Sequence, residues 1–118
     1  MFKANEGASV YVFRQPCDMR CGFDRLSEYV KAQTKVNPLR GDYFVFLSKS
    51  KDRVKILMWE MDGFWLFYKR LEAGTFKVSF CEGYEVITEV DLKALLQGME
   101  LERIKLRKSA ESGCFSGS

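Results

Sequence analysis

The sequence predicts one α+β domain, in which an antiparallel β-meander of about four to five strands carries two packed helices. Three observations lead to this expectation. The chain has 118 residues, of which 47% are apolar and 14% aromatic, so it can form a real hydrophobic core. Its middle holds short β-favouring runs separated by turn residues. Apolar residues at helical spacing flank this region on both sides, which is typical of an α+β layer arrangement.

The first predicted elements are a strand and a helix. Val10–Phe13 is a short β-favouring run that ends near Pro16. Asp18 is then placed to cap a helix. The apolar stripe of that helix has helical spacing and comprises Met19, Phe23, Leu26 and Val30.

Four further runs predict the remaining strands. Residues 43–47 are continuously apolar, which indicates an interior strand covered on both faces. Residues 53–60 and 64–70 flank Asp62-Gly63, the strongest short-range signal for a hairpin turn. Residues 75–80 alternate between apolar and polar like a fourth strand of the meander. Short connections between successive strands therefore predict an antiparallel sheet.

A second helix is predicted near the C-terminal end. Thr88 begins a capping-box pattern that has Asp91 where Glu or Gln is usual. The apolar face of this helix comprises Leu92, Leu95, Leu96 and Met99. We expect the two helices to cover one face of the sheet, a single domain over residues 1–108, and a flexible C-terminal tail over 109–118.

Composition narrows the classes of function. The net charge is +3, which permits contact with nucleic acid without requiring it. The absence of histidine removes the commonest general base and metal ligand. Residues 1–6 lack the apolar segment of a signal peptide, and no apolar run has the length of a membrane helix. We therefore expect a cytoplasmic protein with reduced cysteines, no membrane association and no cofactor.

The predicted hairpin has two chemically different faces. With Asp62-Gly63 as a two-residue turn, Met61 would pair with Phe64. One face would then comprise Arg53, Lys55, Leu57, Trp59, Leu66, Tyr68 and Arg70. The opposite face would comprise Val54, Ile56, Met58, Trp65 and Phe67, and we expect it to lie in the core.

Cations beside aromatic rings are suited to nucleic acid, because phosphates pair with Lys and Arg while bases stack on rings. The predicted nucleic-acid-binding residues are Arg20, Arg25, Arg53, Lys55, Trp59, Tyr68, Lys69 and Arg70. The same pattern is also typical of a solvated sheet face that a helix partly covers. A patch of Leu57, Trp59 and Tyr68 would equally suit a protein adaptor. The basic stretch 103–108 fits either phosphate contact or a solvated terminal extension.

Catalytic and metal-binding alternatives have weaker support. A metal-dependent nuclease can use carboxylates without histidine, and the candidates are Asp18, Asp24, Glu60 and Asp62. Capping explains Asp18 better, and a turn explains Asp62 better. Cys17 and Cys21 would share a face if they lay on a helix, but the Cys-x-x-Cys spacing of strong metal sites is missing. We therefore predict a non-enzymatic protein without a metal site.

Several short motifs, in this order and spacing over residues 9–108, resemble one protein family. The motifs are Asp18-Met19-Arg20, Gly22-Phe23-Asp24, Asn37-Pro38, Phe44-Val45-Phe46, Val54-Lys55-Ile56-Leu57, Tyr68-Lys69-Arg70-Leu71-Glu72 and Gly74-Thr75-Phe76. The family is the accessory protein encoded by the second open reading frame of the "sixty-six" class of bacterial insertion sequences. It is often called TnpB and is unrelated to the RNA-guided nuclease of that name.

The resemblance implies an accessory role in DNA transposition, beside a separate transposase that holds the catalytic acidic residues. We expect the partners to be DNA and either the transposase or a sister accessory protein of the same element. The sequence departs from the family at Cys17, Cys21 and Arg25, and at Lys77-Val78 after Phe76. The resemblance also implies that Phe23, Leu26 and Val54 belong to the core.

Overall fold

A computed structural model describes residues 7–112, with side chains described as far as Leu106. The five strands are β1 (Val10–Phe13), β2 (Tyr43–Leu47), β3 (Arg53–Glu60), β4 (Gly63–Arg70) and β5 (Tyr84–Ile87). The helices are α1 (Phe23–Thr34), the short 3₁₀ helix η1 (Pro38–Arg40), α2 (Glu89–Leu96) and α3 (Leu101–Ser112). The predicted α+β class is confirmed. The predicted tail overlaps the end of α3, and its residues 113–118, like the N-terminal residues 1–6, lie outside the described part.

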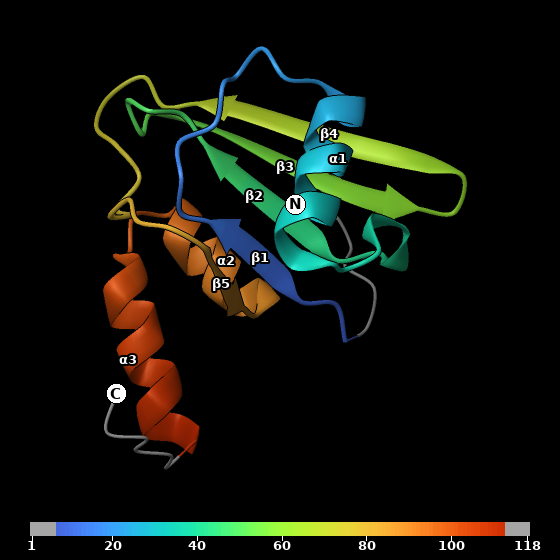
Figure 1. Ribbon diagram of the computed structural model, residues 1–118. Helices are drawn as coiled ribbons and strands as arrows, with labels where there is room; N and C mark the ends of the chain where they lie inside the picture. The colour runs from blue at the N-terminus through green and yellow to red at the C-terminus, as the bar shows by residue number, and fades with distance from the viewer. Residues whose placement is uncertain (1–6, 113–118) are drawn as a thin grey trace.

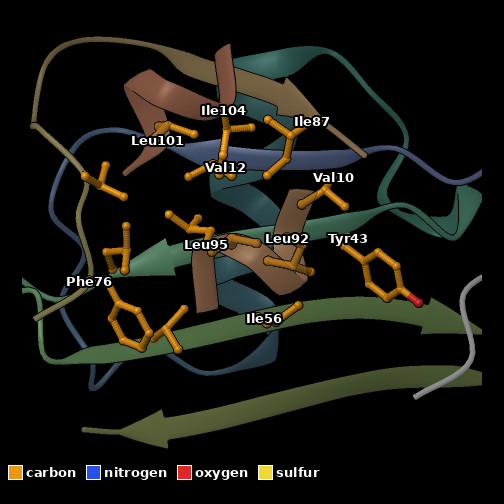
Figure 2. Packing of buried hydrophobic residues seen from close by; sticks show 14 of the residues in the cluster. Val10, Val12, Tyr43, Ile56, Phe76, Ile87, Leu92, Leu95, Leu101 and Ile104 are labelled. Carbon is orange, nitrogen blue, oxygen red and sulfur yellow. The ribbon is translucent and has the colours of Figure 1, made fainter. Parts of the chain in front are cut away.

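The strands form one sheet in the order β4-β3-β2-β1-β5, with helices on both faces (Figure 1). α1 packs on one face through Leu26 and Val30. α2 and α3 pack on the other face, where Leu92 and Ile104 join the core (Figure 2). The expectation that helices cover only one face is therefore wrong. Every residue of β2 is buried, as its continuous apolar run predicted, because helices cover both faces of the central strands.

The sheet is not antiparallel throughout, because β1 and β2 run parallel with Val10 opposite Tyr43. The other three pairs of neighbouring strands are antiparallel. The exception follows from the connection: α1 lies between β1 and β2, and a helical crossover of this length joins parallel strands. The strand–helix–strand order in the sequence was the signal for this arrangement.

The β3–β4 hairpin forms, but its register differs from the predicted one by two residues. Glu60 pairs with Gly63 and Trp59 with Phe64, so the two-residue loop is Met61-Asp62. Met61 takes the left-handed conformation with φ of 56°, and Gly63 begins the returning strand. Because side chains alternate with a period of two, a shift of two residues leaves both predicted faces unchanged.

Residues 75–80 do not form the predicted fourth strand. Phe76 and Val78 are buried, as the alternation indicated. The backbone instead makes isolated contacts: Phe76 N–H donates to the Lys51 carbonyl at 2.7 Å, and Leu101 N–H donates to the Lys77 carbonyl at 2.9 Å. The fifth strand is β5, which pairs with β1.

α1 begins later than predicted. Its N-cap is Gly22, which makes no side-chain capping bond, so Asp18 is not the cap. Met19 lies before the helix, and Phe23 is 46% exposed at its first position rather than in the core. Leu26 and Val54 are buried, as expected.

α2 begins with the predicted capping box, in which Thr88 and Asp91 bond reciprocally to each other's backbone. α3 was not predicted as a helix, and it includes the whole basic stretch 103–108 that fitted a solvated extension. Leu101 and Ile104 anchor it to the core (Figure 2).

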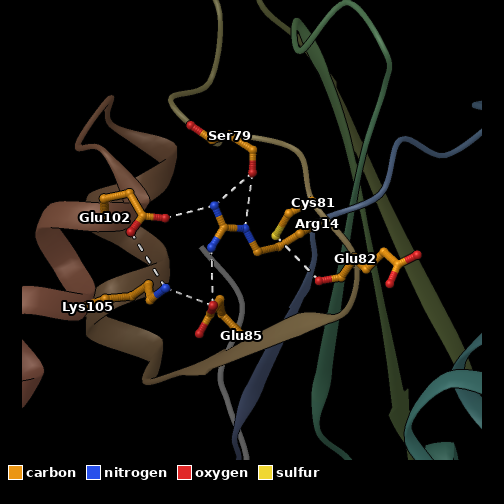
Figure 3. A network of polar contacts seen from close by, with 7 residues as sticks. All are labelled: Arg14, Ser79, Cys81, Glu82, Glu85, Glu102 and Lys105. Atoms are coloured by element: carbon orange, nitrogen blue, oxygen red, sulfur yellow. Dashed lines mark hydrogen bonds and ion pairs between the residues drawn. The ribbon is translucent and has the colours of Figure 1, made fainter. Parts of the chain in front are cut away.

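A polar network centred on the buried Arg14 also holds α3 to the sheet (Figure 3). The Arg14 guanidinium donates to the Ser79 carbonyl at 2.8 Å and pairs with Glu102 of α3 at 2.8 Å. It also pairs with Glu85 of β5 at 3.2 Å, and Lys105 completes the network with Glu85 at 3.0 Å. Arg14 therefore links β1, β5 and α3.

Candidate functional site

The predicted binding residues do not form one continuous surface. Arg53, Lys55 and Trp59 lie along β3 on the face that α1 covers, where Leu57 belongs to the core under α1. Tyr68 and Arg70 of β4 lie on the same face, opposite Lys55 and Arg53 respectively. The eight predicted residues fall into separate groups that differ in exposure and neighbours.

Lys55 is buried and is used within the protein. Its side chain is 7% exposed, and Nζ donates to the carbonyl oxygens of Met19 at 2.6 Å and Cys21 at 2.8 Å. Nζ also lies 4.9 Å from the centre of the Tyr68 ring. Lys55 therefore holds the loop before α1 against the sheet, and its ammonium does not face a solvent phosphate.

Three other cations gather at the far end of β3 from the hairpin loop. Arg20, Lys49 and Arg53 line a depression of about 540 Å³ between the loop before α1 and the turn that joins β2 to β3. We call this depression the cationic groove. Its other lining residues are Cys17, Asp18, Met19, Ser48 and Ser50. Arg70 flanks the groove, because it pairs with Arg53 across the hairpin.

The turn from Ser48 to Asp52 fixes two of these cations. Ser48 N–H donates to the Arg53 carbonyl at 3.0 Å, and Lys51 takes the left-handed conformation with φ of 63°. The Ser50 hydroxyl donates to the Asp52 carboxylate and holds the pKa of Asp52 below its usual range. This ordered turn sets Lys49 beside the start of β3.

Arg53 is only partly satisfied by its protein neighbours. Its buried Nε lies 3.8 Å from the Asp52 carboxylate and has no hydrogen-bond partner among the described residues. Interaction with the Tyr68 hydroxyl raises the pKa of Arg53, so the guanidinium stays charged. The buried Nε cannot reach a ligand, but the Arg53 side chain is 42% exposed, and the exposed part of a guanidinium is suited to phosphate oxygens.

Asp18 is the acidic member of the groove. The Arg20 guanidinium donates to both carboxylate oxygens of Asp18, with Nη2 to Oδ2 at 2.8 Å. This bond, together with the nearby charge of Arg25, lowers the pKa of Asp18 to about 2. Arg20 is nevertheless 91% exposed, so an incoming anion can reach it.

The remaining predicted residues lie elsewhere. Trp59 is near the hairpin loop, half-buried edge-on against Phe64 with ring centres 4.9 Å apart. Lys69 pairs with Val54 and lies on the opposite face of the sheet. Arg25, on α1, lines a separate apolar depression with Cys17, Cys21 and Tyr29. The predicted adaptor patch of Leu57, Trp59 and Tyr68 is not continuous, because Leu57 is fully buried.

The candidate carboxylates and thiols have different surroundings in the described part of the structure. Cys17 and Cys21 lie in the loop before α1 rather than on a helix, and both are half-buried. Burial, together with the neighbouring Cys21, raises the pKa of Cys17 to about 11, which disfavours the thiolate. Glu60 accepts a hydrogen bond from the Trp65 indole at 2.9 Å. Within residues 7–112, no group of three or more acidic or cysteine residues is placed to hold a metal ion.

Sequence reasoning missed Lys49, the cation that completes the groove. In the sequence, Lys49 lies in the short polar connection between the predicted strands 43–47 and 53–60. The available signal was its position in the turn, four residues before Arg53. The described helices include none with the length and apolarity needed to cross a bilayer.

Comparison with known proteins finds one matching family model and two similar proteins from one organism. Residues 8–106 match the family model described as IS66 Orf2 like protein. The uncharacterized protein y4hO of Sinorhizobium fredii is 35% identical over 101 residues, covering 85% of this chain and 88% of the relative. The uncharacterized protein y4jC of the same organism is 30% identical over 106 residues, covering 89% and 91% of the two chains. No solved structure matches the chain.

Proposed function

The chain belongs to the family of IS66 Orf2-like proteins, which are associated with transposition, and on this premise we propose that it binds the phosphate backbone of DNA as a non-enzymatic accessory factor. One observation carries the proposal. Arg20, Lys49 and Arg53, which come from two distant parts of the sequence, line one groove that Arg70 flanks. Such a cluster positions a protein on DNA without reading its sequence.

The structure supports a narrower contact set than the sequence did. Arg20, Arg53 and Arg70 stay in the proposed interface and Lys49 joins them, while Tyr68 supplies a ring that is 53% exposed beside Arg53. Arg25 adds positive potential near Asp18. Three predicted residues are left out of the proposed interface. Lys55 is buried, Trp59 is remote from the groove, and Lys69 faces the other side of the sheet.

Fluorescence anisotropy tests the proposal. Labelled probes would be an insertion-element terminal repeat, a scrambled duplex and a single strand, each at two or more salt concentrations. We expect affinity to fall steeply as salt rises, because phosphate contacts release counterions. The double variant Lys49→Gln/Arg53→Gln should bind about tenfold more weakly and reduce the salt slope by roughly one to two.

The matched control is Lys31→Gln/Lys93→Gln, which removes the same charge from exposed positions on α1 and α2. It should change affinity far less than the groove variant. Equal losses of DNA affinity in both variants would show that net charge, rather than the groove, accounts for binding.

A protein adaptor for the transposase is the alternative function, and one observation favours it. At the β3–β4 hairpin loop, Met61 is 91% exposed and Trp65 is 52% exposed, so apolar side chains are available to a partner. If no DNA probe binds at low salt, the adaptor function becomes the better explanation. Nuclease-resistant co-purification with the transposase, lost in Met61→Ser/Trp65→Ser, would support it directly.

A further inference from the structure

β4 forms one edge of the sheet, and no strand of the described residues 7–112 pairs with its outer side. β4 ends the sheet order, and β3 is its strand neighbour (Figure 1). In an antiparallel ladder, alternate residues of an edge strand turn their N–H and C=O groups away from the sheet. Such an edge is a template for another strand.

Apart from Lys69 and Arg70 at its end, this edge lacks the features that usually block strand addition. β4 contains no proline, and its register with β3 is unbroken from Arg70 to Gly63, so it has no bulge. Residues 64–68 are all aromatic or aliphatic. Trp65 and Tyr68 are 52% and 53% exposed, although both are large aromatic side chains. At eight residues, β4 is long enough to pair with another strand.

The charges along the strand indicate which partner. Lys69 and Arg70 lie at one end of β4. Next to its other end are two acidic residues, Glu60 at the end of β3 and Asp62 in the hairpin loop. A second copy running antiparallel brings the basic end of each strand against the acidic end of the other. With Leu66 opposite its own counterpart, Arg70 comes opposite the position of the loop residue Asp62, and the apolar centres of the two strands face each other.

We propose that the protein forms a symmetric dimer in which β4 of one copy pairs antiparallel with β4 of a second copy around Leu66. The two five-stranded sheets then become one continuous sheet. Even-numbered residues of β4 face even-numbered residues of the partner, so the pleat is preserved and the α1 faces of both copies lie on the same side.

Sedimentation equilibrium on the full chain, without DNA, tests the association. We expect dimers at micromolar concentrations. Hydrogen exchange measured above and below the dissociation concentration should show added protection at β4 amides and none in α1. A monomer at 200 μM would overturn the proposal, and so would a dimer whose β4 amides gain no protection.

Charge reversal tests the register. Arg70→Glu and Asp62→Arg should each weaken the dimer about tenfold, because each places like charges together in both symmetry-related contacts. The double variant Arg70→Glu/Asp62→Arg should restore association, because the opposite charges face each other again. Lys93→Glu on α2 is the matched control and should leave association unchanged.

Circular dichroism should show that all four variants are folded. Failure of the double variant to recover association would overturn the register centred on Leu66. Because these measurements contain no DNA, their failure leaves the cationic groove to be judged by its own binding experiment.

Discussion

Lys55 illustrates why a cation on a sheet strand does not by itself indicate a binding surface. The sequence placed it on the correct face of the hairpin, between Arg53 and Leu57. Alternation along a strand does not show which segment packs over that face. Here the loop before α1 passes over Lys55 and leaves two carbonyl groups for its ammonium to satisfy. Contacts between distant segments, rather than strand periodicity, decided its role.

Replacing Lys55 should therefore lower stability rather than DNA affinity. Lys55→Met keeps the aliphatic stem but leaves the Met19 and Cys21 carbonyl groups without their donor. The expected loss in free energy of unfolding is about 1–3 kcal/mol, the cost of removing a charged hydrogen-bond partner from a buried site. Urea denaturation would measure it.

Lys69→Met is the control, because Lys69 is exposed on the opposite face of the same hairpin. Its effect should stay within about 0.5 kcal/mol, as for most surface substitutions. Below the unfolding transition, Lys55→Met protein should bind DNA as the unchanged protein does. A loss of affinity at unchanged stability would instead make Lys55 a phosphate contact.

At the scale of elements, those with a strong local sequence signal were predicted correctly, and those with a weak signal were not. The all-apolar run of β2 and the capping box of α2 each had a strong local signal, and both predictions are confirmed. Among the residues of α3 whose side chains are described, 101–106, Leu101 and Ile104 are the buried anchors, set among charged residues. A single pair of apolar residues three positions apart does not identify a helix. The Arg14 network that holds α3 joins segments that are distant in the sequence.

The alternation over residues 75–80 correctly indicated which side chains are buried but not a strand. Phe76 and Val78 fill the core, while the backbone finds no strand to pair with. The pairing positions beside β1 are taken by β2 and β5. Burial and ladder formation are separate properties, and a period of two reports only the first.

The attachment of α3 should depend on pH through Glu102. The hydrogen bond from Arg14 lowers the pKa of Glu102 below its ordinary value of 4.5. Because the folded pKa is depressed, the stabilisation is complete above the unfolded pKa and is lost as pH falls through the folded pKa. Glu102→Gln should lower the free energy of unfolding at pH 7, by less than about 1 kcal/mol because this side chain is partly exposed.

The difference in free energy of unfolding between Glu102→Gln and the unchanged protein should shrink as pH drops from about 5 to 3. In this range the Glu102 carboxyl group becomes protonated in both the folded and the unfolded state. Urea denaturation at several pH values would measure this convergence. The control Glu28→Gln, at an exposed position on α1, should change the free energy of unfolding by a small amount that does not vary with pH. A Glu102→Gln difference that stayed constant with pH would show that the ion pair contributes nothing to the stability of α3.

At the scale of the whole molecule, the two proposals combine into one geometry. The cationic groove opens on the α1 face, and in the proposed dimer both α1 faces lie on the same side of the joined sheet. Arg70 lies four residues from Leu66 along β4. At about 3.4 Å per residue, the two Arg70 positions are separated by roughly 27 Å along the strand direction.

Duplex length should therefore control affinity. A span of roughly 27 Å corresponds to about 8 base pairs at 3.4 Å each, so a 20-base-pair duplex can contact both grooves while a 6-base-pair duplex contacts only one. Linking the two contacts should strengthen binding by about ten- to a hundredfold, beyond the few-fold gain from extra positions on the longer DNA. Anisotropy with both lengths at matched salt would measure this advantage.

The variant Trp65→Glu distinguishes the contribution of the dimer to DNA affinity from that of the groove. Trp65 lies on the opposite face from Arg53 and close to the proposed strand pairing, so the new charge should weaken association without entering the groove. We expect the length advantage to disappear in this variant while affinity for the short duplex stays nearly constant. Val90→Glu makes the same charge change at an exposed position on α2 and should keep the advantage. If Trp65→Glu retained the full advantage as a monomer, two grooves on one dimer could not be its cause, and the longer duplex would have to contact a second surface on a single copy.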